Sequence, residues 1–203
     1  MSFIFSEDAA LKALLQGITV SDDKASNRPV VVYFANPDIE ERLQTYPYIT
    51  IELINNVWAS DRQTSGVIID NDAQGTIAPQ DNVLYGYEIP VAWDLIYQVT
   101  AYSRHPRHDR TIMTYLLDRV FQNNRGFLPV KNDLGTETGY RHMFLREFAK
   151  RDVVEEGRRL YRTVFTVSVA SEGTAILSDA IAAVQSVEIN TTTADIPPGL
   201  QIP

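Results

Sequence analysis

The chain has 203 residues, 44% of them apolar, and a formal net charge of −8. The absence of cysteine excludes a disulfide framework, a thiol nucleophile and a zinc-thiolate site. No stretch approaches the roughly 20 apolar residues that cross a bilayer, and Glu7 and Asp8 fall where a secretory signal would be uncharged. We therefore expect a chain made and kept in a cytoplasm, with enough apolar residues for one core.

The charges are unevenly distributed along the sequence. Residues 1–100 carry 5 basic and 14 acidic side chains, residues 101–163 carry 13 basic and 8 acidic ones, and residues 164–203 carry 4 acidic and no basic ones. Such a division is compatible with an ordinary mixed surface. It is equally compatible with an acidic face that meets a basic face on a neighbouring subunit, where unlike charges would fix partner and register.

The first quarter of the chain predicts a short helix and two strands. Residues 7–16 read as a helix with Ser6 as its N-cap, acidic residues in the first turn, and Gly17 at its end. Residues 28–35 are rich in β-branched and aromatic side chains, and residues 46–55 alternate between apolar and polar, so both read as strands. A turn or two of helix is expected over 38–44.

Residues 56–87 read as a long inserted loop, which is typical of functional or mobile segments. Only 67–69 and 83–85 within it suggest weak strands. Because the segment is polar and contains glycine, we expect it to be mobile in the free subunit and ordered in an assembly.

The clearest secondary-structure pattern in the chain is a strand followed by a helix. Residues 90–102 alternate for a full strand, and a helix begins near Pro106 and runs to about Asn123, with a wide apolar stripe that predicts packing on a sheet. Two long strands, 140–154 and 158–171, are predicted as a hairpin. Together these elements predict an α+β fold. It has a mixed, mainly antiparallel sheet, one long helix packed on it, a short N-terminal helix, a long inserted loop and an extended C-terminal arm.

We expect a single domain over 1–172, with the insertion at 56–87, and a C-terminal extension over 173–203. The last part of that extension, 190–203, contains no Lys or Arg and includes a Pro-Pro-Gly run, so it reads as an extended arm. We expect this arm to lie across a neighbouring subunit.

The sequence offers little catalytic chemistry. It lacks the phosphate-binding glycine loops, the nucleophile elbow of hydrolases, the H-E-x-x-H motif and a calcium loop. His105, His108 and Asp109, with His142 further along, are the only candidate metal cluster, and solvated or capping histidines are the favoured interpretation. Neighbouring acidic pairs such as Glu40-Glu41 point apart and are expected in solvent. We expect no cofactor, no metal and no enzymatic activity.

The two tryptophans are expected in different environments. Trp93 lies in the alternating strand and is expected in the core, whereas Trp58 lies near the start of a polar segment and is a candidate interface anchor.

The order of these elements resembles that of the tail terminator and related tail-completion proteins of tailed bacteriophages and phage-like contractile particles. The resemblance rests on Val91 to Arg104 (VAWDLIYQVTAYSR), on Asp109-Arg110 and on the helix with Leu116 to Val120 (LLDRV), and it covers residues 28–171 in order. It implies a ring of six subunits at the head-proximal end of a tail tube, where the ring stops tube growth and offers a docking surface to the neck.

The partners that the resemblance implies are other copies of the chain, tail-tube proteins and neck or connector proteins. DNA would pass through the channel transiently, no membrane is involved, and the location would be the virion tail after assembly in a host cytoplasm. Another neck subunit, such as a stopper or a head–tail adaptor, remains a close alternative. A host-surface or carbohydrate-binding tail module and an enzyme are weaker ones.

We predict a heterologous subunit interface that includes Arg104, Arg107 and Arg110 on one side, since their spacing of three would place them on a shared face. Trp58 is the fourth candidate. The same arginines could instead be solvated, or could contact the phosphates of DNA.

Overall fold

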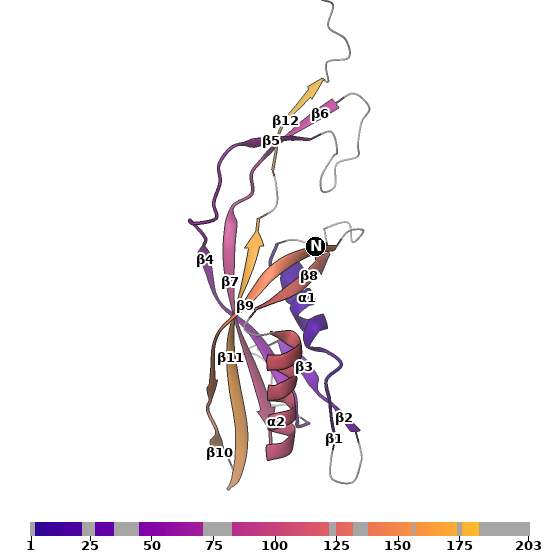
Figure 1. Ribbon diagram of the computed structural model, residues 1–203, viewed down its shortest axis with the longest axis vertical. Helices are drawn as coiled ribbons and strands as arrows, with labels where there is room; N and C mark the ends of the chain where they lie inside the picture. The colour runs from indigo at the N-terminus through magenta and orange to yellow at the C-terminus, as the bar shows by residue number, and fades with distance from the viewer. Residues whose placement is uncertain are drawn as a thin grey trace, which may run out of the picture.

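A computed structural model describes residues 3–21, 27–34, 45–70, 83–121, 125–131, 138–155, 157–173 and 176–182. The molecule is elongated: a body of sheet and helices stands at one end, and a narrow arm of three strands extends from it (Figure 1). The helix predicted over 38–44 and the C-terminal segment 190–203, predicted as an extended arm, lie outside the described residues.

The body is built on a seven-stranded sheet with the order β3-β4-β7-β11-β9-β8, in which β10 pairs with the far end of β11. Only the β3–β4 pair is parallel, and the other pairs are antiparallel. The predicted mixed, mainly antiparallel α+β fold is therefore confirmed. The strands are β3 (Val31–Phe34), β4 (Tyr48–Trp58), β7 (Ala92–Ser103), β8 (Arg125–Lys131), β9 (Thr138–Lys150), β10 (Val153–Glu155) and β11 (Arg158–Glu172).

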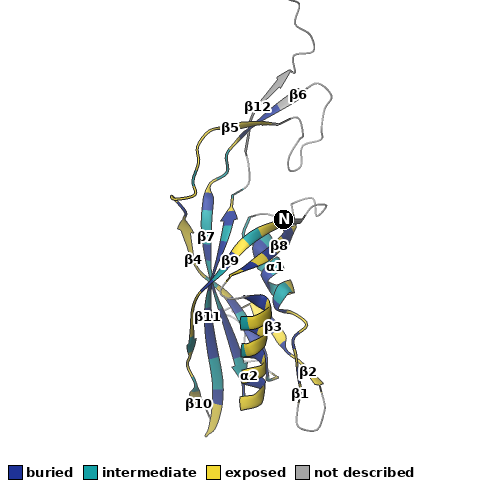
Figure 2. Ribbon diagram, viewed as in Figure 1, coloured by how far each residue is buried: buried dark blue, intermediate teal, exposed yellow. Residues whose placement is uncertain are grey.

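Strand β7 lies at the centre because its alternation suits a strand with neighbours on both sides. Leu95, Tyr97 and Val99 face the core and are fully buried, and their partners in register on β11 are the buried residues Val169, Val167 and Phe165. Figure 2 shows this buried band running through the middle of the body. Trp93 is partly buried against the same core, as predicted.

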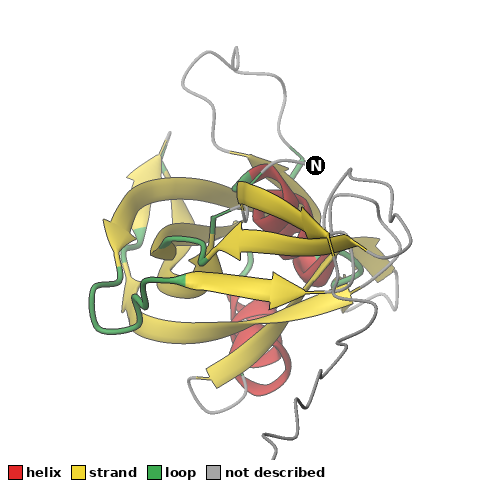
Figure 3. Ribbon diagram, turned by 90° about the horizontal axis from the view of Figure 1, so that it is seen from above, coloured by secondary structure: helices red, strands yellow, loops and turns green. Residues whose placement is uncertain are grey.

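Both helices pack on one face of the sheet, which curls around them when seen from above (Figure 3). They are α1 (Phe5–Leu15) and α2 (Pro106–Tyr115). Leu11 and Leu15 of α1 and Ile112 of α2 have no exposed surface. A small hairpin of β1 (Thr19–Ser21) and β2 (Asn27–Pro29), which the sequence did not reveal, links α1 to β3.

The long predicted helix over 106–123 is shorter and less regular than its pattern indicated. The α-helical part ends at Tyr115, and one π-helical turn, η1 (Leu116–Val120), continues it. The wider turn keeps Leu116 and Val120 buried against the core. The predicted apolar stripe therefore packs on the core, although its last turn is π-helical and not α-helical.

The N-terminus of α1 also differs from expectation. Ser6 is not the N-cap, since the helix begins at Phe5 and its cap is Ile4. The carboxylate of Glu7 accepts hydrogen bonds from the backbone N–H of Ile4 and from the Ser6 hydroxyl, both at 3.0 Å. The folded-back acidic side chain thus satisfies the N–H of the cap residue, whereas a serine cap would have accepted from an N–H further into the first turn. At the other end, Gly17 adopts φ 90°, which agrees with its predicted role.

The arm is a second sheet with the order β12-β6-β5, built from β5 (Val67–Asp70), β6 (Val83–Glu88) and β12 (Ile176–Ala182). The two weak strands expected inside 56–87 are thus present, and they form one antiparallel pair. Within the expected C-terminal extension, residues 176–182 form a strand on β6, which sequence reasoning missed. Among the residues of known placement, no helix is long and apolar enough to span a membrane.

Candidate assembly surfaces

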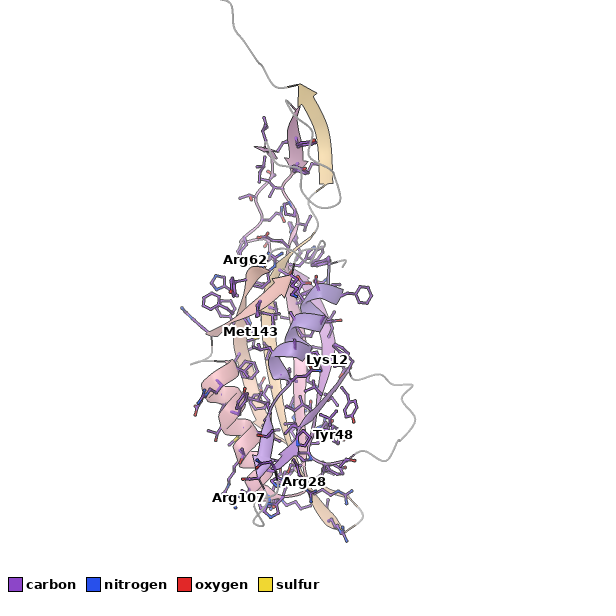
Figure 4. All side chains as sticks on the ribbon, turned by 90° about the vertical axis from the view of Figure 1, so that its right-hand side faces the viewer. Lys12, Arg28, Tyr48, Arg62, Arg107 and Met143 are labelled. Atoms are coloured by element: carbon purple, nitrogen blue, oxygen red, sulfur yellow. The ribbon has the colours of Figure 1, made fainter. Side chains whose placement is uncertain are left out.

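Two of the four predicted interface residues share one surface. Arg107 and Arg110 are exposed on α2 and line a shallow depression along its outer side, together with Tyr115 and Arg119. The helix is amphipathic, so His108, Asp109 and Ile112 face inward while the arginines face out. Figure 4 shows Arg107 at one end of the body, near Arg28.

Arg104 does not join that face, contrary to the spacing argument. It precedes the helix, in the bend that follows β7, and its guanidinium lies 4.7 Å from the centre of the Tyr46 ring. The i, i+3 rule applies only inside a helix, and α2 starts two residues later, at Pro106. Arg104 still belongs to the same end of the molecule.

That end of the body is rich in arginine. Two tyrosine rings stack on the outer face of the sheet there: the ring centres of Tyr48 and Tyr102 lie 4.7 Å apart. The guanidinium of Arg162 lies 5.7 Å from the centre of the Tyr102 ring. The hairpin of β10 and β11 adds exposed arginines nearby. We call this surface the basic end, and it comprises Arg28, Arg104, Arg107, Arg110, Arg151, Arg158, Arg159 and Arg162.

The position of α2 at the basic end is set by a buried carboxylate. Asp109 is 3% exposed, accepts a hydrogen bond of 3.1 Å from the Thr163 hydroxyl, and forms an ion pair with Lys150 of β9. A buried charge requires such partners. The first turn of α2 is therefore fixed to two neighbouring strands, and the arginines beside it have a defined direction.

Trp58 lies at the opposite end of the body. It is 56% exposed and pairs in register with Trp93, at the start of β7, whereas Arg104 follows the end of β7. The strand between them spans roughly 35 Å at about 3.3 Å per residue. The four predicted residues thus form two distant surfaces, which is the arrangement that a head-to-tail contact needs.

The surroundings of Trp58 carry acidic side chains, two of which are paired with arginines: Asp94 with Arg62 and Arg146, and Glu172 with Arg141. Residues 56–94 contain six acidic and one basic residue in sequence. The single basic one, Arg62, donates to Oδ1 of Asp94 at 2.7 Å, and Figure 4 places Arg62 far from Arg107. We call this surface the acidic end, and it comprises Asp61, Glu88, Asp94 and Glu172 among the described side chains.

The three histidines are not arranged as the ligands of a metal site. The rings of His105 and His108 lie 5.1 Å apart, but His105 is the N-cap of α2 and its Nδ1 accepts the Arg107 N–H at 3.3 Å. His142 lies on β9, beside the Phe127 ring. Within the described ranges, no three His, Asp or Glu side chains are grouped as metal ligands would be. The absence of metal remains a prediction.

One exposed feature escaped sequence reasoning. The outer face of β8 and β9 carries an aromatic strip in which His142 lies 5.0 Å from Phe127 and 6.1 Å from Phe144, between ring centres. Phe127 is 59% exposed and Tyr140, opposite Pro129, is 68% exposed. Alternation in β8 was the available signal, since Leu128 and Val130 face inward and leave Phe127 outside.

No protein-family model matches the chain, and no curated protein does. Among solved structures, the chain is similar to one described as the "PVC sheath/tube terminator in extended state" of an extracellular contractile injection system. The likeness has a TM-score of 0.43 at 15% sequence identity. It covers 97% of this chain, which spans 66% of the length of that protein.

Proposed function

We propose that this chain is a non-enzymatic structural protein of a phage or phage-like tail: a tail terminator that assembles head to tail into a closed ring. The ring, of six copies, sits at the head-proximal end of the tail tube and joins it to the neck. Its partners are copies of itself, tail-tube subunits and neck proteins, and its location is the assembled tail.

The observation that carries the proposal is the separation of charge along the elongated body. Arginines gather at the basic end. Trp58 lies at the other end, a β7 length away, beside acidic side chains of which Asp94 and Glu172 already pair with arginines of the same chain and Asp61 and Glu88 are exposed. Unlike patches on one chain favour a heterologous contact, which closes into a ring when the rotation between subunits divides a full turn. Complementary charges set the register of such a contact.

The sequence supports the same assignment independently. The strand, the bend with Ser103-Arg104 and the helix after it occur in the order of the tail-terminator resemblance, within the proposed domain 1–172.

The proposal has a direct functional test. Tail-tube protein from the same gene neighbourhood would be polymerised alone and with this chain, and tube lengths and ends would be imaged by electron microscopy. A terminator shortens the tubes in proportion to its concentration and leaves a ring on one end only. Tubes of unchanged length without end rings would contradict the proposal, and a ring that binds connector protein but no tube would favour the neck-adaptor alternative.

A further inference from the structure

Strand β5 is the outer strand of the arm, and its apolar side chains are exposed. The sheet order β12-β6-β5 pairs one edge of β5, and no strand among the described residues pairs the other. Val67, Ile68 and Ile69 are 54%, 49% and 61% exposed. Successive side chains of a strand point to opposite faces, so β5 exposes apolar side chains on both faces, beside an edge that no described strand covers.

An exposed apolar edge strand of this kind is unusual in a monomeric protein. Natural edge strands carry a lysine, a proline or a bulge that prevents pairing with another chain. β5 has none of these before Asp70, and its register with β6 is regular from Val67 opposite Glu88 to Asp70 opposite Tyr85. An apolar, unprotected edge of this kind is suited to accept an added strand.

A candidate for that strand lies in the chain itself. At least 21 residues follow Ala182, the last residue of β12. Within them, residues 186–193 (SVEINTTT) alternate: Val187, Ile189, Thr191 and Thr193 would share one face of a strand. The segment is rich in β-branched residues and contains no Lys or Arg, so it suits pairing with an apolar edge.

The geometry of the arm indicates which β5 this segment meets. Ala182 pairs with Val83, so the chain leaves β12 at the tip of the arm (Figure 1). Its own β5 lies on the far side of β6, and the chain would have to cross the end of the sheet and reverse to reach it. A second copy carries the same edge, and pairing with it would not require the chain to return across its own sheet.

We propose that residues 186–193 of one copy add as a strand to the open edge of β5 in the neighbouring copy, linking the arms around the ring. This inference rests on the head-to-tail association proposed above. The added strand would form main-chain hydrogen bonds with the open edge of β5 and would place its side chains beside Val67, Ile68 and Ile69.

The cysteine-free sequence allows a clean cross-linking test. One preparation carries Ile69→Cys, and a set of others, with a different tag, carries a single cysteine at each position from 186 to 193. The two are mixed at assembly concentration, oxidised and separated without reductant. Ile54→Cys, on an exposed apolar residue of β4 (48%, against 61% for Ile69), is the acceptor control. Circular dichroism and melting confirm that each variant folds.

The expected result is a disulfide between differently tagged copies, several-fold above the Ile54→Cys control and strongest at alternate donor positions. In the wild-type assembly, hydrogen exchange at Val67–Asp70 should slow at least tenfold relative to a chain ending at Ala182. If a chain with both cysteines links only to itself, the inference is wrong. If no link forms while the ring persists, the inference fails and the proposed function stands. A chain that stays monomeric at assembly concentration contradicts both.

Discussion

The hydroxyl of Tyr97 donates a hydrogen bond of 2.7 Å to Oδ1 of Asp8, and so ties the N-terminal helix to the centre of β7. Tyr97 is fully buried and Asp8 partly so. The same helix turn also holds Glu7, whose carboxylate is 2% exposed and accepts the Ser171 hydroxyl of β11. Two neighbouring acids of α1 thus reach two different strands.

Replacing Tyr97 with Phe should lower the free energy of unfolding by about 1–3 kcal/mol, because the Asp8 carboxylate loses its donor while it stays partly desolvated. Chemical denaturation measures the change. Tyr140→Phe is the control, since that side chain is 68% exposed. Equal stability of the two variants would show that the bond to Asp8 contributes nothing.

The stability of the protein should depend on pH through Asp8. Burial raises the pKa of Asp8 above its ordinary 3.8, the hydrogen bond from Tyr97 partly offsets this, and the nearby Glu7 raises the pKa further. A raised folded pKa means that the contribution of Asp8 is fully present below about pH 3.8 and is lost as pH rises through the folded value.

Asp8→Asn removes this titration. The stability of the wild type relative to the variant should therefore fall as pH rises from about 3.8, and then level off above the folded pKa. Thermal unfolding of both proteins between pH 3 and pH 7 provides the curves. A wild type that gains stability relative to Asp8→Asn over that range would reverse the sign and refute the assignment.

The ion pair between Lys150 and Asp109, which fixes α2 to the sheet, should stabilise the folded protein. Lys150→Met should lower the free energy of unfolding by about 1–3 kcal/mol, because the buried Asp109 carboxylate loses its cation and keeps the hydrogen bond from the Thr163 hydroxyl. The loss should be smaller than for a fully buried pair, because the Lys150 side chain is 44% exposed. Arg151→Met, an exposed neighbour, should change stability by less than about 0.5 kcal/mol. Equal losses in both variants would indicate a general charge effect.

Trp58→Ala should separate stability from assembly. The side chain is 56% exposed, so the melting temperature of the subunit should hardly change. If Trp58 anchors the contact, association should weaken by about 2 kcal/mol or more, roughly 30-fold. Phe5→Ala, at 69% exposure on α1, is the control. Association that weakens equally in both variants would deny Trp58 a specific role.

Much of the body could be predicted from the sequence, because its elements carry strong local patterns. The strand expected over 90–102 occurs as Ala92–Ser103, and that over 158–171 as Arg158–Glu172. The strand expected over 140–154 divides after Lys150 into β9 and β10. There the chain bends so that β10 can pair back on β11, while the carboxylate of Asp152 accepts a hydrogen bond from Arg159.

The features that sequence reasoning missed depend on distant residues. Glu7 looked like an ordinary first-turn acid, but its partner Ser171 lies 164 positions away. Likewise, nothing local to 176–182 reveals that it pairs with a strand near residue 85. The predicted interface residues fell on two surfaces for the same reason, since spacing in sequence does not show that Trp58 and Arg107 lie at opposite ends of β7.

The most direct measurement of the central claim is the molar mass of the protein in solution as a function of salt, by sedimentation velocity. Wild type should form one closed species of six subunits at low salt and lose mass as salt rises. Arg107→Glu with Arg110→Glu should abolish that species, whereas the matched reversal Arg125→Glu with Lys131→Glu, on β8, should leave it intact. A ring of unchanged mass in the Arg107/Arg110 variant, or a wild type that stays monomeric at every salt concentration, would contradict the account.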